Sequence, residues 1–382
     1  MPELVPYTLT FRGGLHLGTG AESLEESLAS IPFDTLFAAM LDAWLRSGND
    51  PQQFAEPFTD ATHEPPFLLT SAFPFAGEIR FYPAPVNLAS QFTESTLEQY
   101  GKTIKRIRFI SEGILQQAMH GGLLDPYLFP KDEGAEPNLG AALQGGTFWL
   151  LTEETEKLPE KMRRPVGKKH ALRLLPVFSI HPVPRVTIDR IHLASQIFHA
   201  SRVTFEKGCG LWFGVQWRSP ERPVGTSKTT FRGALEHCLH ILQDDGLGGE
   251  RTTGHGSFTY QQGKPFTLPD PQPNRPSLLL SRYHPRPNEL PETLANTMSA
   301  YHLVSVGGWL RSLGNPSQRR KRLMMIAEGS LIVPSTLPAG DVCDVRPTYK
   351  HPEGDLAHPV YRMGYALAIG WQLAAGKEAE NA

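Results

Sequence analysis

The segment Leu247-Gly-Gly-Glu-Arg-Thr-Thr-Gly-His-Gly-Ser-Phe258 places four glycines within nine residues, interleaved with arginine, threonine and histidine. Glycine occurs where the backbone takes positive φ angles or passes close to a ligand. Consecutive backbone N–H groups in such a loop can bind an anion, and Arg251, Thr252 and Thr253 add donors that suit phosphate. The segment lacks the Gly-Lys-Ser/Thr ending of a nucleotide-binding P-loop, so ATP and GTP are not the expected ligands. A plain glycine-rich surface turn is the alternative interpretation.

The flanking sequence predicts a helix before this loop and a strand after it. Apolar residues recur with helical period at about 227–242, and a short strand pattern covers 257–261. A second glycine-rich loop, Arg12–Gly20, carries His16 and follows a predicted strand at 5–11. The chain therefore contains two glycine-rich connections, each next to a predicted strand.

A strong helical pattern begins at Phe33, with Pro32 in its first turn. Its apolar face is predicted to be core, with these members: Phe33, Leu36, Phe37, Met40, Leu41, Trp44 and Leu45. Asp34 stands at the N-terminal end, where it either caps the helix or contacts the ribose of a bound nucleotide.

Alternating patterns predict three hairpins, formed by residues 68–75 with 79–82, 199–205 with 211–217, and 303–310 with 323–333. Further strands are predicted at 147–151 and 360–370. The basic run Arg319–Arg322 falls at the predicted tip of the third hairpin, where it is either solvated or contacts a partner or RNA. Strands and helices alternate similarly in both halves of the chain. We therefore predict an α+β protein with two ferredoxin-like, RRM-like domains.

The length of 382 residues also favours two domains. The segment Glu153–Arg164 is acidic, then basic, and contains one proline, with another directly after it, so the predicted boundary lies there. The domains are then residues 1–155 and 156–382.

Charge is unevenly distributed although the net charge is only −2. Residues 161–232 contain fourteen Lys/Arg against three Asp/Glu, a net +11, so the remainder carries −13. A local basic face on an acidic protein suits binding of an anion at one place. The segment Lys102–Arg108 alternates basic and apolar residues, so Lys105 and Arg106 lie on a face that contacts a phosphate backbone or is simply solvated.

The cysteines and the N-terminal sequence limit which cofactors and which cellular location are expected. The three cysteines, Cys209, Cys238 and Cys343, include no Cys-x-x-Cys pair, so neither disulfides nor a cofactor or metal are expected. His237 and His240 flank Cys238, but that cysteine falls on the apolar side of the predicted helix. No signal peptide or membrane-spanning run is recognised, which predicts a cytoplasmic protein.

Several motifs, taken together and in order, resemble the RAMP superfamily of CRISPR-associated RNA-binding proteins, and within it the family of fourth Csm subunits of type III-A effector complexes. The resemblance extends nearly end to end. It rests on the glycine-rich loop 247–258 and on these segments: 14–18, 33–37, 66–75, 186–190, 328–330 and 358–365.

The resemblance implies a non-catalytic subunit of an antiviral ribonucleoprotein that binds the repeat-derived 5′ handle of the crRNA. It also implies two protein partners, namely the large Cas subunit with nuclease and cyclase activity and a backbone RAMP subunit. Family members project a β-hairpin thumb into the guide–target RNA duplex. Here the candidate thumb is the basic segment at about 181–199, with Ile188 and Ile191 as possible wedges.

The candidate RNA-binding residues come from the two glycine loops, the basic segments and the matched motifs. They are His16, Gly18, Thr19, Asp34, Lys105, Arg106, Arg185, Arg190, Gly248, Gly249, Arg251, Thr252, Thr253, Gly254, His255, Gly256 and Arg362. Single-stranded RNA is held through its phosphates and read on its base edges, which suits arginines beside flexible glycine loops.

Two alternative functions remain open. A RAMP endoribonuclease would process precursor crRNA with His16 as general acid or base, although no second histidine or tyrosine is tied to it by sequence. An assembly protein would contact RNA only incidentally. In that case the +11 segment would tolerate charge reversal without loss of crRNA.

Overall fold

The computed structural model describes residues 3–18, 29–60, 64–132, 138–163, 172–189, 194–251, 254–310, 318–347, 356 and 358–373. Within these ranges the α-helices are α1 (Phe33–Arg46), α2 (Pro51–Thr59), α3 (Glu94–Ile104), α4 (Glu112–Met119), α5 (Glu160–Arg163), α6 (Phe231–Asp245) and α7 (Leu290–Leu294). No helix in the described part of the chain is both long enough and apolar enough to cross a membrane.

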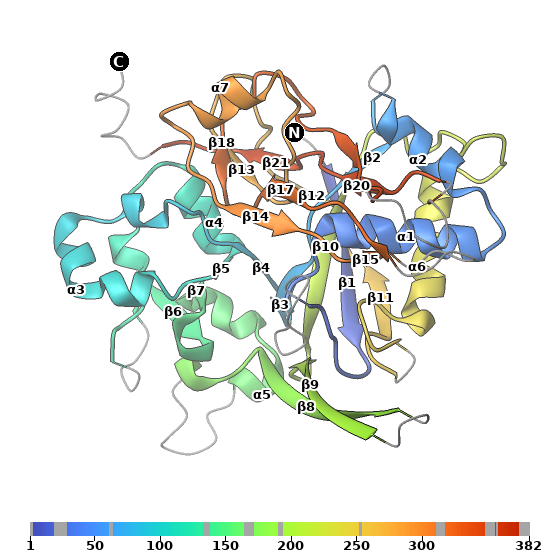
Figure 1. Cartoon of the computed structure of the whole chain (residues 1–382). Helices are drawn as coiled ribbons and strands as arrows, with labels where there is room; N and C mark the ends of the chain where they lie inside the picture. The colour runs from blue at the N-terminus through green and yellow to red at the C-terminus, as the bar shows by residue number, and fades with distance from the viewer. Residues whose placement is uncertain are drawn as a thin grey trace.

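A ten-stranded mixed sheet forms the centre of the molecule (Figure 1). Its main path runs in the order β11-β1-β10-β3-β4-β5-β7-β6, with β12 also paired to β1 and β2 to β10. The strands are β1 (Glu3–Phe11), β2 (Phe67–Leu69), β3 (Phe73–Ala76), β4 (Ile79–Pro83), β5 (Phe109–Ser111), β6 (Gly140–Leu143), β7 (Phe148–Leu151), β10 (Cys209–Trp217), β11 (Phe258–Gln262) and β12 (Phe266–Thr267). Only the β5–β7 pairing is parallel among those named here.

Smaller sheets surround this centre. The C-terminal part of the chain supplies β13 (Ser277–Leu279), β14 (Leu303–Val306), β15 (Trp309–Leu310), β16 (Gln318–Arg319), β17 (Leu323–Ile326), β18 (Leu331–Ile332), β19 (Val342–Asp344), β20 (Tyr361–Met363) and β21 (Ala368–Gly370). They pair as β18-β13-β21, β14-β17, β15-β16 and β19-β20. The long strands β8 (Phe178–Asp189) and β9 (Ala194–Phe205) pair with each other and project from the body (Figure 1).

Helix α1 confirms the pattern predicted from its sequence. Phe33, Phe37 and Met40 are buried with the rest of the predicted face, except that Leu41 is half-buried and Leu45 is 40% exposed. Pro32 occupies the N-cap position and has no side chain that can cap the helix. A distant hydroxyl takes this role instead, because the Phe33 N–H donates to Ser71 Oγ at 3.0 Å.

Helix α6 packs beside α1 and ends at the glycine-rich segment. Thr230 caps its N-terminus by accepting a hydrogen bond from the Gly233 N–H, and Gly246 follows its last residue with φ of +81°. Its buried face includes Cys238, which explains why this cysteine is unavailable to a metal site with its neighbouring histidines. The predicted helix and the strand after the loop are both confirmed.

One predicted hairpin is wrong. Residues of β9 were expected to pair with those of β10, but β9 pairs with β8, and β10 inserts between β1 and β3. Only residues 206–208 separate β9 from β10, and such a short connection is typical of a hairpin. The choice was decided by burial, because β10 is almost wholly buried between two neighbours.

The central sheet contains strands from both sides of residue 155. β1 pairs with β10 through Tyr7–Phe213 and Leu9–Leu211, and on its other edge with β11. The protein is therefore a mixed α/β protein with one large mixed sheet. The ferredoxin-like character of its two halves stays a prediction.

Candidate nucleic-acid interface

The two glycine-rich segments lie against each other, although more than 220 residues separate them in the chain. The Gly249 N–H donates to the His16 carbonyl at 2.8 Å, and the Gly256 N–H donates to the Gly14 carbonyl at 2.8 Å. A third bond joins the Arg12 N–H to the Ser257 carbonyl at 2.9 Å. The structure therefore combines the described parts of the two predicted loops into one site, which we call the glycine junction (residues 12–18, 246–251 and 254–257).

Close backbone approach explains two of the glycines at this junction. Gly248 has φ of +88°, and a Cβ atom there would lie 2.3 Å from the His16 carbonyl oxygen. Gly256 has φ of +79°, and its Cβ would lie 2.0 Å from the Leu247 carbonyl oxygen. A side chain at position 248 would push the two loops apart, and one at position 256 would distort the second loop itself.

The buried side chain of His16 stabilises the junction. The residue is only 5% exposed, and its Nδ1 lies 2.6 Å from the carbonyl oxygen of Ser201. Because a carbonyl only accepts, Nδ1 carries the hydrogen and the ring is fixed in one orientation. The ring also lies against Gly249, where a Cβ atom would come within 2.9 Å of His16 Cδ2.

The base of the β8–β9 hairpin completes the junction. Leu15 and Val203 exchange two backbone hydrogen bonds of 2.8 Å, so β9 is attached to the first glycine loop. Arg202 extends across Gly14, where a Cβ atom would lie 1.9 Å from Arg202 Cδ. The buried Nε of Arg202 has no hydrogen-bond partner. The site thus contains a partly exposed arginine, with its Nε buried and unsatisfied, at the point where three segments meet.

Three arginines at the surface around the junction form ion pairs with aspartates. Arg251 Nη1 lies 3.8 Å from Asp42, Arg12 Nη1 lies 2.9 Å from Asp244, and Arg46 Nη2 lies 3.1 Å from Asp42. Exposed pairs of this kind contribute roughly 0–1 kcal/mol each. A phosphate group can therefore replace a carboxylate as the partner of Arg251 at little cost in stability.

Asp34 and Arg362 bind each other. The Arg362 guanidinium donates a short hydrogen bond to Asp34, and the two residues are 4% and 1% exposed respectively. This ion pair connects α1 to β20 across 328 residues of sequence. With this burial neither side chain offers a surface to RNA in this conformation. Their predicted contact with RNA stays a prediction, and their evident contribution is to join the two halves of the chain.

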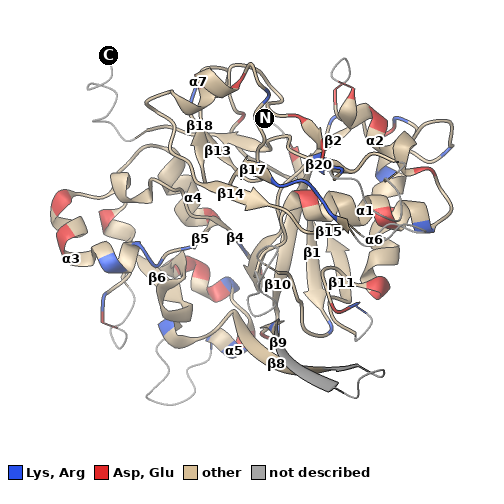
Figure 2. Ribbon diagram, in the orientation of Figure 1, with Lys and Arg blue, Asp and Glu red and all other residues tan. Residues whose placement is uncertain are grey.

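More charged groups surround this pair. Arg282 lies 3.8 Å from Asp34 and 3.6 Å from Glu328, and Glu328 also accepts a 2.5 Å hydrogen bond from Ser71. Burial and the neighbouring Arg362 guanidinium lower the pKa of Arg320 to about 10, although Asp34 acts in the opposite direction. Arg282 and Arg362 therefore pair with Asp34 and Glu328, and Arg320, from the run Arg319–Arg322 seen as one blue stretch in Figure 2, adds a third positive charge close to them.

Other predicted site residues lie apart from the junction. Lys105 and Arg106 are exposed in the turn that ends α3, on the opposite side of the molecule from α1 and α6 (Figure 1). Gly254 and His255 stay within the junction, and Gly18 is exposed at its edge. Predictions for the following lie outside the described residues or side chains: Thr19, Arg185, Ile188, Arg190, Ile191, Thr252 and Thr253.

The cysteines offer no activated thiolate. Burial raises the pKa of the Cys209, Cys238 and Cys343 thiols to about 12 each, with a nearby carboxylate adding to the effect at Cys209 and Cys343. All three are free. Thiols that stay protonated near neutral pH are poor nucleophiles.

Sequence reasoning missed Arg202, Ser201, Arg282 and Glu328. Arg202 belongs to the basic segment 161–232, so composition pointed to its neighbourhood but not to the residue. Arg282 and Glu328 meet only through tertiary packing, and no spacing rule connects them. Glu328 did fall in a segment on which the family resemblance rests.

Comparison with known proteins identifies one matching family and several related sequences. Residues 272–371 match the family model of the CRISPR Csm4 C-terminal domain. A CRISPR system protein Csm4 of Thermococcus onnurineus is 28% identical over 266 residues, covering 66% of this chain and 78% of the relative. The Csm4 protein of Mycobacterium tuberculosis is 23% identical over 346 residues, covering 90% and 92%. The predicted family resemblance is confirmed.

Solved structures agree on the fold. A chain of the Csm3–Csm4 subcomplex of a type III-A interference complex superposes with a TM-score of 0.60 at 17% identity, covering 97% of this chain and 100% of that one. A chain of a Csm1–Csm4 cassette in complex with cA4 gives 0.54 at 18% identity, covering 98% and 100%. Both chains therefore share the overall fold of this protein.

Proposed function

We propose that this chain, a Csm4 subunit of a type III CRISPR complex, binds the repeat-derived 5′ handle of the crRNA at the glycine junction. The observation that carries the proposal is the convergence of three segments at one place. Two glycine-rich loops and the base of the β8–β9 hairpin meet around Gly14, His16, Arg202 and Gly248. None of these contacts is needed to close the central sheet, whose strands are already paired.

The chemistry of the junction suits a single-stranded RNA end. Glycines allow the phosphate–sugar backbone to approach closely, and Arg202 and Arg251 lie at the junction with donors for phosphate oxygens. His16 acts as a fixed internal brace in this proposal, since its Nδ1 is already hydrogen-bonded to Ser201. Specific reading of handle bases would come from the loop edges.

The β8–β9 hairpin is the proposed thumb. Its twelve paired positions, from Phe178–Phe205 to Asp189–Ala194, extend it away from the sheet. Ile180 and Val186 are 47% and 56% exposed on it, so apolar surface is available along the hairpin. An exposed apolar side chain at the duplex would separate neighbouring base pairs by insertion.

The partner proteins are proposed from the same relatives. A Csm1-type large subunit and a Csm3-type backbone subunit would dock on either side of this chain, as the names of the related complexes suggest. The subunit would then fix the handle at one end of the complex. It would act by holding RNA and proteins in place.

Endoribonuclease activity is the competing function. A general acid or base must reach the proton it transfers, and His16 is buried with Nδ1 already bonded to a carbonyl. Cleavage of labelled repeat RNA by the purified protein, abolished in His16→Ala, would establish the enzyme and overturn the binding-only proposal. We expect intact RNA with both proteins.

The decisive experiment is purification of the tagged complex from its host and sequencing of the bound RNA. We expect small RNAs that share one repeat-derived 5′ end, together with a large partner subunit. Arg202→Gln and Arg251→Gln should each weaken handle binding. If each substitution removes one phosphate interaction, it should also reduce the slope of log K against log salt by about 0.7.

Arg275→Gln is the matched control, because it removes one positive charge at an exposed position outside the junction. Its handle affinity and salt dependence should equal those of the unmodified complex. Equal behaviour of Arg202→Gln, Arg251→Gln and the control would exclude the junction as the handle site. It would favour the interpretation that this chain contacts RNA only incidentally.

A further inference from the structure

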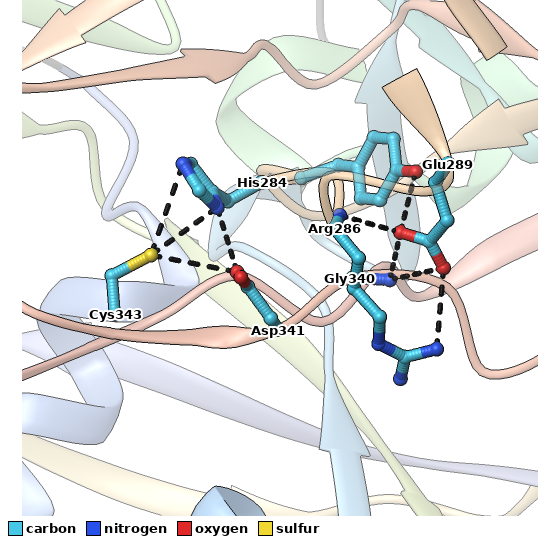
Figure 3. Close-up of polar contacts among 7 residues, drawn as sticks. His284, Arg286, Glu289, Gly340, Asp341 and Cys343 are labelled. Atoms are coloured by element: carbon cyan, nitrogen blue, oxygen red, sulfur yellow. Dashed lines mark hydrogen bonds and ion pairs between the residues drawn. The ribbon is translucent and has the colours of Figure 1, made fainter. Parts of the chain in front are cut away.

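A cluster of three potential metal ligands lies in the C-terminal part of the chain, apart from the glycine junction (Figure 3). It consists of His284, Asp341 and Cys343. His284 Nδ1 lies 2.6 Å from Asp341 Oδ1 and 3.3 Å from Cys343 Sγ, and Cys343 Sγ lies 3.5 Å from Asp341 Oδ1. A nitrogen, an oxygen and a sulfur donor therefore point to one place.

The separations approach those of a tetrahedral zinc site. Zinc binds thiolate sulfur at about 2.3 Å and histidine nitrogen or carboxylate oxygen at about 2.0–2.2 Å, so neighbouring ligand atoms lie about 3.3–3.6 Å apart. The two distances from Cys343 Sγ, 3.3 and 3.5 Å, already match. Only the 2.6 Å contact between His284 and Asp341 must lengthen, which happens when a metal replaces the shared hydrogen.

The backbone around the ligands is fixed by three hydrogen bonds. The His284 N–H donates to Gly364 O at 3.0 Å, the Gly364 N–H donates to Asp341 O at 2.8 Å, and the Asp341 N–H donates to His284 O at 3.2 Å. Gly364 has to be glycine here, because a Cβ atom would lie 2.5 Å from His284 Cβ. Cys343 is held by the pairing of β19 with β20.

A buried carboxylate holds the residues next to two of the ligands. Glu289, 2% exposed, accepts hydrogen bonds from Tyr283 Oη at 3.0 Å and from the Gly340 N–H at 3.1 Å. It also accepts one from the Arg286 N–H at 2.8 Å, as Figure 3 shows. Tyr283 and Gly340 directly precede His284 and Asp341. The same carboxylate thus positions both ligand segments before any metal arrives.

A catalytic Cys–His–Asp arrangement does not fit the same atoms. In a triad the nucleophile and the orienting carboxylate use different ring nitrogens of the histidine. Here Asp341 and the nearest approach of Cys343 both involve Nδ1 of His284, at 2.6 and 3.3 Å. Convergence of all three groups on one side of the ring is the arrangement that a common central ion requires.

We propose that His284, Asp341 and Cys343 bind one zinc ion, with water in the fourth position. The mixed nitrogen, oxygen and sulfur set suits zinc. The His284 and Asp341 side chains are 25% and 29% exposed, so an ion can enter from solvent. Cys343 releases its thiol proton when it binds the ion.

The site lies in the fold where an ion would have structural consequences. It connects the segment after β13 with β19, and Cys343 pairs directly with Arg362, the residue that binds Asp34 of α1. A zinc ion would thus stabilise the same strand pair that fastens the C-terminal part to the first helix. No metal was expected from the sequence, which has no Cys-x-x-Cys pair, and no spacing pattern connects His284 with Asp341, 57 residues away.

Metal content of the untagged full-length chain, after dialysis against metal-free buffer, tests the proposal. Inductively coupled plasma mass spectrometry should find about one zinc per chain. Replacement by Co²⁺ should produce a thiolate-to-metal charge-transfer band together with the strong visible absorption of four-coordinate cobalt. Cys343→Ser should lose the charge-transfer band and stoichiometric zinc, and Asp341→Asn should lose stoichiometric zinc.

Cys238→Ala is the matched control, since it removes a thiol from α6 and leaves the cluster intact. It should keep both the zinc and the cobalt band, while thermal unfolding confirms that each variant is folded. If Cys343→Ser proves unfolded, Asp341→Asn, which keeps the shape of the side chain, decides the matter. A dialysed wild-type chain without zinc and without a cobalt–thiolate band overturns the proposal, as does undiminished zinc binding in both ligand variants.

Discussion

The role of Asp34 is determined by the residues that pack against it in the folded chain. At the first turn of α1 it had two ordinary interpretations, a helix cap or an RNA contact. The structure gives it a third role, because Arg362 and Arg282 approach it from the C-terminal part of the chain. A buried charge needs such a partner, since an uncompensated carboxylate in the interior is costly.

Removing one member of this pair should therefore destabilise the protein strongly. Asp34→Asn leaves Arg362, Arg282 and Arg320 with one carboxylate fewer, and Arg362→Met leaves Asp34 without its closest partner. We expect each change to lower the free energy of unfolding by about 3–5 kcal/mol, measured by urea denaturation. The exposed pair Arg232–Glu221 serves as control, where Glu221→Gln should cost less than about 1 kcal/mol.

The double variant Asp34→Asn/Arg362→Met distinguishes a coupled pair from two independent effects. It should be less destabilised than the sum of the single variants, because each change removes the charge that the other leaves unpaired in a low-dielectric interior. Additive losses would show that the two residues act separately.

At the scale of elements, glycine positions show which loops are sterically determined. Gly248 and Gly254 both have positive φ, +88° and +82°, but their surroundings differ. A Cβ at Gly248 would lie 2.3 Å from the His16 carbonyl oxygen, whereas a Cβ at Gly254 would meet nothing within 4 Å. Alanine at each of these two positions therefore distinguishes the energetic cost of backbone strain from that of disturbed packing between the loops.

Gly254→Ala should cost about 1–2 kcal/mol, the penalty of a left-handed backbone conformation for an L-residue. Gly248→Ala should cost more, because the Cβ also displaces the first glycine loop and with it the His16–Ser201 contact. Urea unfolding of both variants measures the difference. Equal costs would mean that the two loops separate without resistance, and the glycine junction would then not be a fixed site.

Helices and hairpins with a strong local sequence pattern could be predicted from the sequence. The choice of partner for a strand distant in the chain could not. α1 and α6 follow from apolar residues at helical spacing, and the β3–β4 hairpin follows from a tight turn at Gly77. The pairing of β9 with β8 instead of β10 did not, because β-strand patterns define faces and not neighbours. For the same reason the two glycine loops were found separately, while their contact and Arg202 between them required the structure.

At the scale of the whole molecule, the central sheet connects the two halves more closely than separate domains require. β1 from the first half has its three partners, β10, β11 and β12, beyond residue 155. The buried pair Asp34–Arg362 makes a second connection, between α1 and β20. Experiments on fragments can therefore test the predicted domain boundary at residue 155.

A fragment of residues 1–155 should not fold alone, because β1 would lose every strand partner and expose Leu4, Tyr7 and Leu9, which the whole chain buries. We expect aggregation or a non-cooperative thermal transition measured by circular dichroism. Co-expression with residues 156–382 should restore a soluble complex with one cooperative transition, since both edges of β1 are then paired. The intact chain is the reference for that transition. A cooperative transition of the isolated fragment would instead mean that residues 1–155 fold without the β1 partners. In that case β1 would connect two domains that each fold independently.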